Sequence, residues 1–250
     1  MTYCVGLCLR DGLVLLSDTR TNAGVDNISS FRKMHVVEEP GERVIVAMTA
    51  GNLAITQAVM SLVTEGPSGP GDETAETLYN VQSMVGAARL VGNAIRKVHD
   101  MDGPGLSAHD IRFDVSVLLA GQIAGRRMRL FQIYAAGNFI EAEPETPFLQ
   151  IGEHKYGKPI LDRALSYDTD LYDGVKLVLV SMDSTLRSNL TVGMPIDLLV
   201  YRRDALKVEL QRRINDEDAY FQSLREGWSN ALREAYLAIP PPDWKPAARG

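Results

Sequence analysis

Short apolar runs separated by turn-forming residues dominate the first part of the chain. Tyr3–Leu9 and Leu13–Ser17 flank Asp11-Gly12, a typical hairpin turn, and predict two paired strands. Val44–Thr49 is almost continuously apolar, which is typical of a strand buried on both faces. The same reasoning predicts further strands at Met34–Glu38, Val115–Gln122, Met128–Ala135, Phe148–Gly152, Val175–Ser181 and Ile196–Arg202.

Other segments repeat apolar residues at intervals of three or four, which is the spacing of one helix face. They predict helices from Asn52 to about Thr64, from Asp72 to near Gly103-Pro104-Gly105, and over Tyr156–Tyr167, Asp204–Arg213 and Asp216–Leu237. Because strands and helices do not alternate regularly, the order predicts an α+β fold with antiparallel sheets packed face to face and helices outside. We expect one domain over residues 1–240, with a helical extension from about residue 204 and a tail at 241–250.

Composition narrows the classes of function. The chain has 250 residues, of which 45% are hydrophobic and 23% charged, as in a globular protein. The formal net charge of −6 leaves no basic surplus for phosphates, which argues against a nucleic-acid partner. The uncharged stretch Val44–Thr64 is long enough to span a bilayer, but Gly51-Asn52 interrupts it. We therefore expect a strand, a turn and a buried helix there, with no membrane partner.

The two cysteines, Cys4 and Cys8, would lie about 13 Å apart on one strand. That separation is too large for a disulfide, so we expect a reducing, cytoplasmic location. The four histidines are scattered without zinc-binding spacing, and neither a metal nor another cofactor is expected.

Thr2 is the first residue with candidate chemistry. If the initiator methionine is removed, Thr2 carries a hydroxyl and a free α-amine, a pair that can serve as nucleophile and general base. The hairpin returns Asp18 close to Thr2, and Lys33 precedes the next strand, so a cation held by a carboxylate could lower the pKa of the hydroxyl. The alternatives are an ordinary chain start, a loop-capping aspartate and a solvated lysine.

These residues also carry a family resemblance. Thr2, Ser17-Asp18-Thr19-Arg20, Lys33 and Thr49-Ala50-Gly51 together resemble the active half of a proteasome-type β subunit. Within that family the chain is most similar to the Anbu subfamily, on three segments: Tyr3-Cys4-Val5-Gly6, Lys155-Tyr156-Gly157-Lys158-Pro159-Ile160, and Asp183-Ser184-Thr185 with the following Arg187-Ser188-Asn189. The resemblance implies an N-terminal nucleophile hydrolase fold, a four-layer αββα sandwich of two antiparallel sheets between helices.

The resemblance also implies roles for single residues. Thr2 would attack a peptide carbonyl, with its own amine as base, Lys33 tuning the hydroxyl, Asp18 fixing Lys33 and the Gly51 N–H meeting the oxyanion. The substrate pocket would be formed by Arg20, Thr21, Thr49 and Leu53, with Gln57 nearby, although the pocket residues can equally be read as packing residues.

Two positions depart from the family pattern. Glu153 stands where a supporting serine is common, and it either substitutes for that serine or faces solvent. Ser188 and Asp183 are secondary catalytic candidates, because their mutual spacing differs from the usual one.

The functional hypothesis is a threonine peptidase acting on peptides or unfolded polypeptides inside a ring or stacked-ring homo-oligomer. One alternative is an N-terminal nucleophile amidase acting on a small amide, and another is a catalytically weak scaffold ring. The sequence contains no nucleotide-binding loop, so any ATP use would belong to a separate chain.

Overall fold

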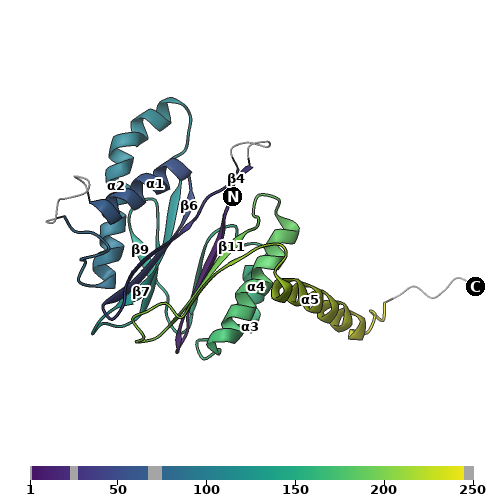
Figure 1. Ribbon diagram of the computed structural model, residues 1–250. Helices are drawn as coiled ribbons and strands as arrows, with labels where there is room; N and C mark the ends of the chain where they lie inside the picture. The colour runs from purple at the N-terminus through teal and green to yellow at the C-terminus, as the bar shows by residue number, and fades with distance from the viewer. Residues whose placement is uncertain (1, 23–27, 67–74, 245–250) are drawn as a thin grey trace, which may run out of the picture.

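The computed structural model describes residues 2–22, 28–66 and 75–244, and two five-stranded antiparallel sheets form its centre (Figure 1). The first sheet has the order β10-β1-β2-β11-β12 and the second the order β5-β6-β7-β8-β9. The first sheet comprises β10 (Phe148–Gly152), β1 (Tyr3–Cys8), β2 (Gly12–Asp18), β11 (Ile196–Arg202) and β12 (Leu210–Ile214). The second comprises β5 (Met34–Glu39), β6 (Arg43–Gly51), β7 (Val115–Ile123), β8 (Arg129–Ile133) and β9 (Phe139–Glu141).

A short ribbon of β3 (Arg20–Asn22) and β4 (Ile28–Ser30) extends from the end of β2. Helices α1 (Leu53–Glu65) and α2 (Met84–Ala108) cover the second sheet, and α3 (Lys158–Ala164) and α4 (Leu171–Ser188) cover the first (Figure 1). Three buried clusters fill the spaces between these layers: one under α1 and α2, one under α3 and α4, and one between the sheets. The predicted four-layer αββα sandwich is confirmed.

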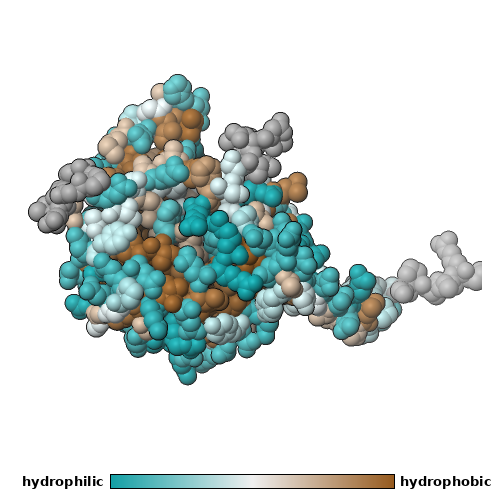
Figure 2. Space-filling model, viewed as in Figure 1, coloured by the Kyte–Doolittle hydropathy of each residue, from teal (hydrophilic) through white to brown (hydrophobic). Residues whose placement is uncertain are grey.

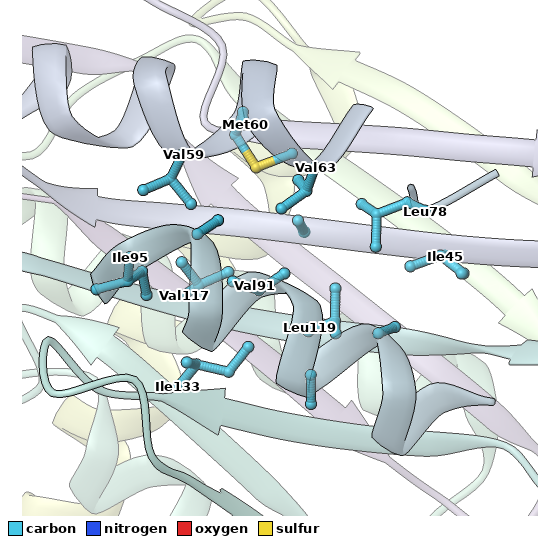
Figure 3. Packing of buried hydrophobic residues seen from close by; sticks show 14 of the residues in the cluster. Ile45, Val59, Met60, Val63, Leu78, Val91, Ile95, Val117, Leu119 and Ile133 are labelled. Atoms are coloured by element: carbon cyan, nitrogen blue, oxygen red, sulfur yellow. The ribbon is translucent and has the colours of Figure 1, made fainter. Parts of the chain in front are cut away.

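The helical layers follow from local sequence signals. Asn52 caps α1 by accepting a hydrogen bond from the backbone N–H of Ala54 at 3.0 Å. Figure 3 shows how side chains such as Val59 of α1 and Val91 and Ile95 of α2 pack toward Val117 and Ile133 of the second sheet. Because β1, β2, β6 and β7 are covered on both faces, they are the nearly continuous apolar runs that the sequence shows.

The prediction of a strand at Val175–Ser181 is wrong, because this segment lies inside α4. Asp170 starts the helix by accepting hydrogen bonds from the N–H groups of Tyr172 and Asp173. The segment is apolar on most sides because α4 lies between the first sheet and the helices α3 and α5 (Ala219–Ala238). A short apolar run of this kind does not distinguish a buried helix from a strand.

Two helix boundaries also differ from the predictions. The helix α2 continues through Pro104 to Ala108, where Leu106 packs against the core and the N–H of His109 bonds to the Leu106 carbonyl at 3.1 Å. Asp72, the predicted start of this helix, lies outside the described residues, and the described helix begins at Met84.

The helical extension begins at Ala219 and not near residue 204. Leu210–Ile214 forms the edge strand β12, in which Arg213 pairs with Asp197 of β11 at 2.8 Å. Its charged residues face outward at the sheet edge and therefore lack the apolar alternation of a buried strand. Among the described residues no helix is long and apolar enough to cross a membrane, and Val44–Thr64 divides into β6 and α1 as expected.

The last helix, α5, projects from the body as an arm (Figure 1). Phe221 is its one buried residue, while Tyr236 and Leu237 are 73% and 71% exposed. Figure 2 shows hydrophobic atoms on this arm among hydrophilic ones. Arg225 attaches the arm to α4 through Asp183, with a distance of 2.7 Å between Nε and Oδ1.

Candidate active site

A cavity of about 470 Å³ opens where β1 begins and where β2 and β6 end. Its lining includes Thr2, Arg20, Thr21, Lys33, Thr49, Gly51 and Leu53, all of which the sequence singles out. Asp18 lies directly beneath this lining and is fully buried. The structure thus brings together in space residues that the chain spreads over its first 53 positions. Gln57 is exposed on α1 and does not line the cavity.

A buried ion pair joins Asp18 and Lys33. The Nζ of Lys33 lies 2.7 Å from Oδ1 of Asp18 and donates a second hydrogen bond to the Arg20 carbonyl at 2.6 Å. The same carboxylate accepts hydrogen bonds from the N–H groups of Tyr3 (3.0 Å) and Gly193 (3.4 Å). Burial raises the pKa of Asp18, whereas the Lys33 ammonium and these N–H groups act in the opposite direction. The ammonium is therefore fixed in direction at the floor of the cavity.

The main chain of Thr2 is held by the turn that follows β10. Tyr3 pairs with Gly152 in the sheet, and the N–H of Glu153 donates to the Thr2 carbonyl at 2.6 Å. Gly152 has a φ of 81°, and a Cβ added there would collide with the Thr2 carbonyl oxygen. A side chain at position 152 would therefore displace Thr2 from the cavity.

The turn between β6 and α1 borders the other side of the cavity. Gly51 has a φ of 114°, and a Cβ there would collide with the carbonyl of Asp114. The same carbonyl accepts a hydrogen bond from the N–H of Asn52 at 2.8 Å, and the N–H of Thr49 donates to the Lys33 carbonyl at 3.0 Å. These bonds fix the turn relative to Lys33.

The segment between α4 and β11, residues 189–195, is hydrogen-bonded to several residues of the site. Besides the bond from Gly193 to Asp18, Arg20 donates to the Leu190 carbonyl at 2.9 Å and Thr19 to the Pro195 carbonyl at 2.6 Å. Asn189 donates from Nδ2 to Oε2 of Glu153 at 2.9 Å. Asn189 directly follows the candidate Ser188 in an Anbu-like segment, but no role for its side chain could be predicted from the sequence.

The two secondary candidates lie away from the cavity. Ser188 is exposed at the end of α4, and Asp183 is buried between Arg187 and Arg225. Neither lines the cavity. Both residues belong to the last turns of α4, whose bounds are Leu171–Ser188.

Glu153 does not face solvent, because it is 6% exposed and hydrogen-bonded. Among the described residues, no group of three or more histidine, cysteine, aspartate or glutamate side chains is arranged to hold a metal ion. Cys4 is buried and Cys8 half-buried, and both are free thiols.

No protein-family model and no curated protein matches the chain, whereas solved structures match it closely. A Gly-1 mutant of Anbu from Hyphomicrobium sp. strain MC1 is 51% identical over 97% of this chain and 100% of that chain, with a TM-score of 0.89. Anbu from Yersinia bercovieri, described as an ancestral β-subunit, is 47% identical over 97% of this chain and 100% of that one, with a TM-score of 0.89. The Anbu complex from Pseudomonas aeruginosa, a helical assembly, is 47% identical over 99% of this chain and 100% of that one, with a TM-score of 0.90.

Two facing antiparallel sheets between helices, with Thr2 beside a cavity at the end of a central strand, define the N-terminal nucleophile hydrolase class. Sequence identities of 47% to 51% over nearly the full length are evidence for a shared family and not only for a shared fold. The chain belongs to the Anbu family of proteasome-like β subunits.

Proposed function

We propose that this chain hydrolyses peptide bonds through Thr2, after removal of Met1 has freed the Thr2 α-amine. The observation that supports this most directly is the shared cavity. Thr2 lines it together with Gly51 and with Lys33, whose ammonium is oriented by the buried Asp18 carboxylate. A nucleophile, a cation and a main-chain turn are the parts that acyl transfer requires.

In the proposed reaction the Thr2 Oγ attacks the substrate carbonyl and transfers its proton to the Thr2 α-amine. The N–H of Gly51 donates to the oxyanion that forms, a kind of contact worth about 3 kcal/mol of barrier. Collapse of the intermediate breaks the C–N bond, and the amine returns the proton to the leaving group. Water then hydrolyses the ester on Thr2. The Lys33 charge favours the deprotonated hydroxyl throughout.

The substrate side chain next to the cleaved bond would lie among Arg20, Thr21, Thr49 and Leu53. Thr49 and Thr21 contribute hydroxyls and Leu53 an apolar surface, so this pocket has mixed polarity. A cavity of about 470 Å³ accommodates a peptide segment.

The proposal includes a homo-oligomer. The arm formed by α5 exposes Leu232, Tyr236 and Leu237, which a monomer leaves in water. The Pseudomonas aeruginosa Anbu complex is described as a helical assembly, and this similarity supports self-association of the present chain. Light scattering coupled to size-exclusion chromatography, followed by electron microscopy, would give the number and arrangement of subunits.

The test of the activity compares Thr2→Ala with Thr2→Ser in a fluorogenic peptide assay. Both substitutions keep a small second residue, but only serine keeps a hydroxyl. We expect Thr2→Ala to lose at least about 10⁴-fold in kcat/KM, as nucleophile removal does in serine proteases, while Thr2→Ser retains measurable turnover. Intact-mass measurement must show that Met1 is absent from all samples.

Unchanged turnover in Thr2→Ala would refute the assignment. Turnover of small acyl amides but not of peptides would favour the amidase, and retention of Met1 in the wild type would favour the scaffold.

A further inference from the structure

Glu153 is a buried carboxylate without a cationic partner in the described part of the chain. Its side-chain oxygens accept hydrogen bonds from the backbone N–H of Lys155 and from Nδ2 of Asn189, each at 2.9 Å. Both donors are neutral, and Asn189 is itself buried. Charged groups removed from water are normally paired with an opposite charge, because unpaired burial carries a large desolvation penalty. The charge of Glu153 therefore needs an explanation.

The position of Glu153 next to Thr2 suggests a cationic partner for this carboxylate. Its backbone N–H donates to the Thr2 carbonyl at 2.6 Å, and the turn at Gly152 closes around the same carbonyl. The two main chains are thus in direct contact. A glutamate side chain is long enough to cross from its own backbone to the α-nitrogen of the residue that this backbone binds. Removal of Met1 would convert that nitrogen from an amide into an ammonium group.

We propose that Glu153 is the carboxylate that receives the α-ammonium of Thr2 and raises its pKa, acting as a positioning residue for the nucleophile. The proposal rests on the proposed function only in requiring that Met1 is removed. During attack the proton leaving Oγ would move to the α-amine, and Glu153 would stabilise the ammonium that results. Asn189 would hold the carboxylate in place from the other side.

The other charged groups around the cavity leave this role to Glu153. Four charged residues lie at or just beneath the cavity that Thr2 lines: Asp18 of β2, Arg20 of β3, Lys33 before β5 and Asp114 before β7. Glu153, after β10, adjoins Thr2 through its backbone N–H. Lys33 and Arg20 lower the pKa of a nearby amine, and Asp18 is already neutralised by Lys33. Asp114 is exposed to solvent at the edge of the cavity, where its charge is screened.

The experiment measures the pKa of the Thr2 α-amine directly and does not depend on turnover. Intact protein is acetylated with trace acetic anhydride from pH 5 to pH 10, and the labelled N-terminal peptide is quantified by mass spectrometry. We expect Glu153→Gln to lower the amine pKa by about one unit, because a neighbouring opposite charge shifts a pKa by one to three units. Glu153→Asp keeps the charge and should retain most of the wild-type value. Asp162→Asn, an exposed carboxylate on α3 paired with Lys158, is the matched control and should change nothing.

The outcomes separate this inference from the proposed function. An amine pKa that is equal in the wild type and Glu153→Gln overturns the inference, even if the enzyme cleaves peptides. A lowered pKa in Glu153→Gln that Glu153→Asp restores supports the inference, even if no peptide is cleaved. Retention of Met1 in the wild type overturns it, since no ammonium would then exist. If Glu153→Gln fails to fold, Glu153→Asp is decisive, and loss of the raised pKa with the charge retained counts against the role.

Discussion

Replacing Asp18 by asparagine tests whether the buried ion pair is as strongly coupled as its surroundings indicate. The side chains of Asp18 and Lys33 are 0% and 6% exposed, so water screens their attraction very little. The asparagine oxygen can still accept the N–H of Tyr3, so most of the hydrogen bonding survives and the lost charge dominates. Removing one member of a buried pair typically costs 3–5 kcal/mol, because the remaining charge is left unpaired. Since Lys33 keeps the Arg20 carbonyl as an acceptor, we expect a value near the lower limit, about 3 kcal/mol.

The assay is urea unfolding followed by far-ultraviolet circular dichroism at fixed protein concentration. With a denaturant slope of about 3 kcal/mol per molar, the midpoint of Asp18→Asn should fall by about 1 M. The double variant Asp18→Asn/Lys33→Met should recover at least about 2 kcal/mol relative to the sum of the single variants, because it leaves no unpaired charge. A loss below about 1 kcal/mol with no coupling would match a solvent-exposed pair and would refute the reasoning.

Two further predictions concern backbone fit and thiol chemistry. Gly152→Ala should strongly reduce both stability and activity, because its Cβ would collide with the Thr2 carbonyl. Gly41→Ala is the control, because Gly41 has a similar φ of 84° but no atom within 4 Å of an added Cβ. In the same unfolding assay it should lower the free energy of unfolding by no more than about 2 kcal/mol. Equal losses in the two variants would show that strain, and not contact with Thr2, is responsible. Burial raises the pKa of Cys4 and raises that of Cys8 to about 11, so at pH 8 both are overwhelmingly protonated. Iodoacetamide at that pH should label neither thiol in the native protein and both in guanidinium chloride, as read by intact mass; rapid native labelling would contradict the burial.

The central strands could be predicted from the sequence because each is covered on both faces. Burial on both sides produces the continuous apolar runs of β1, β2, β6 and β7, and the turn at Asp11-Gly12 fixes the first hairpin. Burial on several sides also explains why the prediction for α4 was wrong. Its run Val175–Ser181 is apolar because the helix packs against the first sheet and against α3 and α5. The capping aspartate Asp170 was the signal that identifies the helix.

Some residues of the candidate site could be predicted from the sequence and others could not. Hairpin geometry predicts that Asp18 lies close to Thr2, with Lys33 just before the next strand, and the family resemblance added Gly51. In the structure Thr2, Lys33 and Gly51 line one cavity, and Asp18 pairs with Lys33. Asn189 could not be found in this manner. It reaches Glu153 across 36 positions of sequence, and only the path of α4 through the fold determines where its side chain lies.

The placement of Thr2 decides how the protein should be produced for any of these measurements. A purification tag fused before Met1 would lead into the space that a substrate needs and would keep the α-nitrogen of Thr2 acylated. Under the proposed mechanism such a preparation would be inert. A tag at the other end of the chain leaves the Thr2 α-nitrogen free, and α5, the last helix, points away from both sheets (Figure 1).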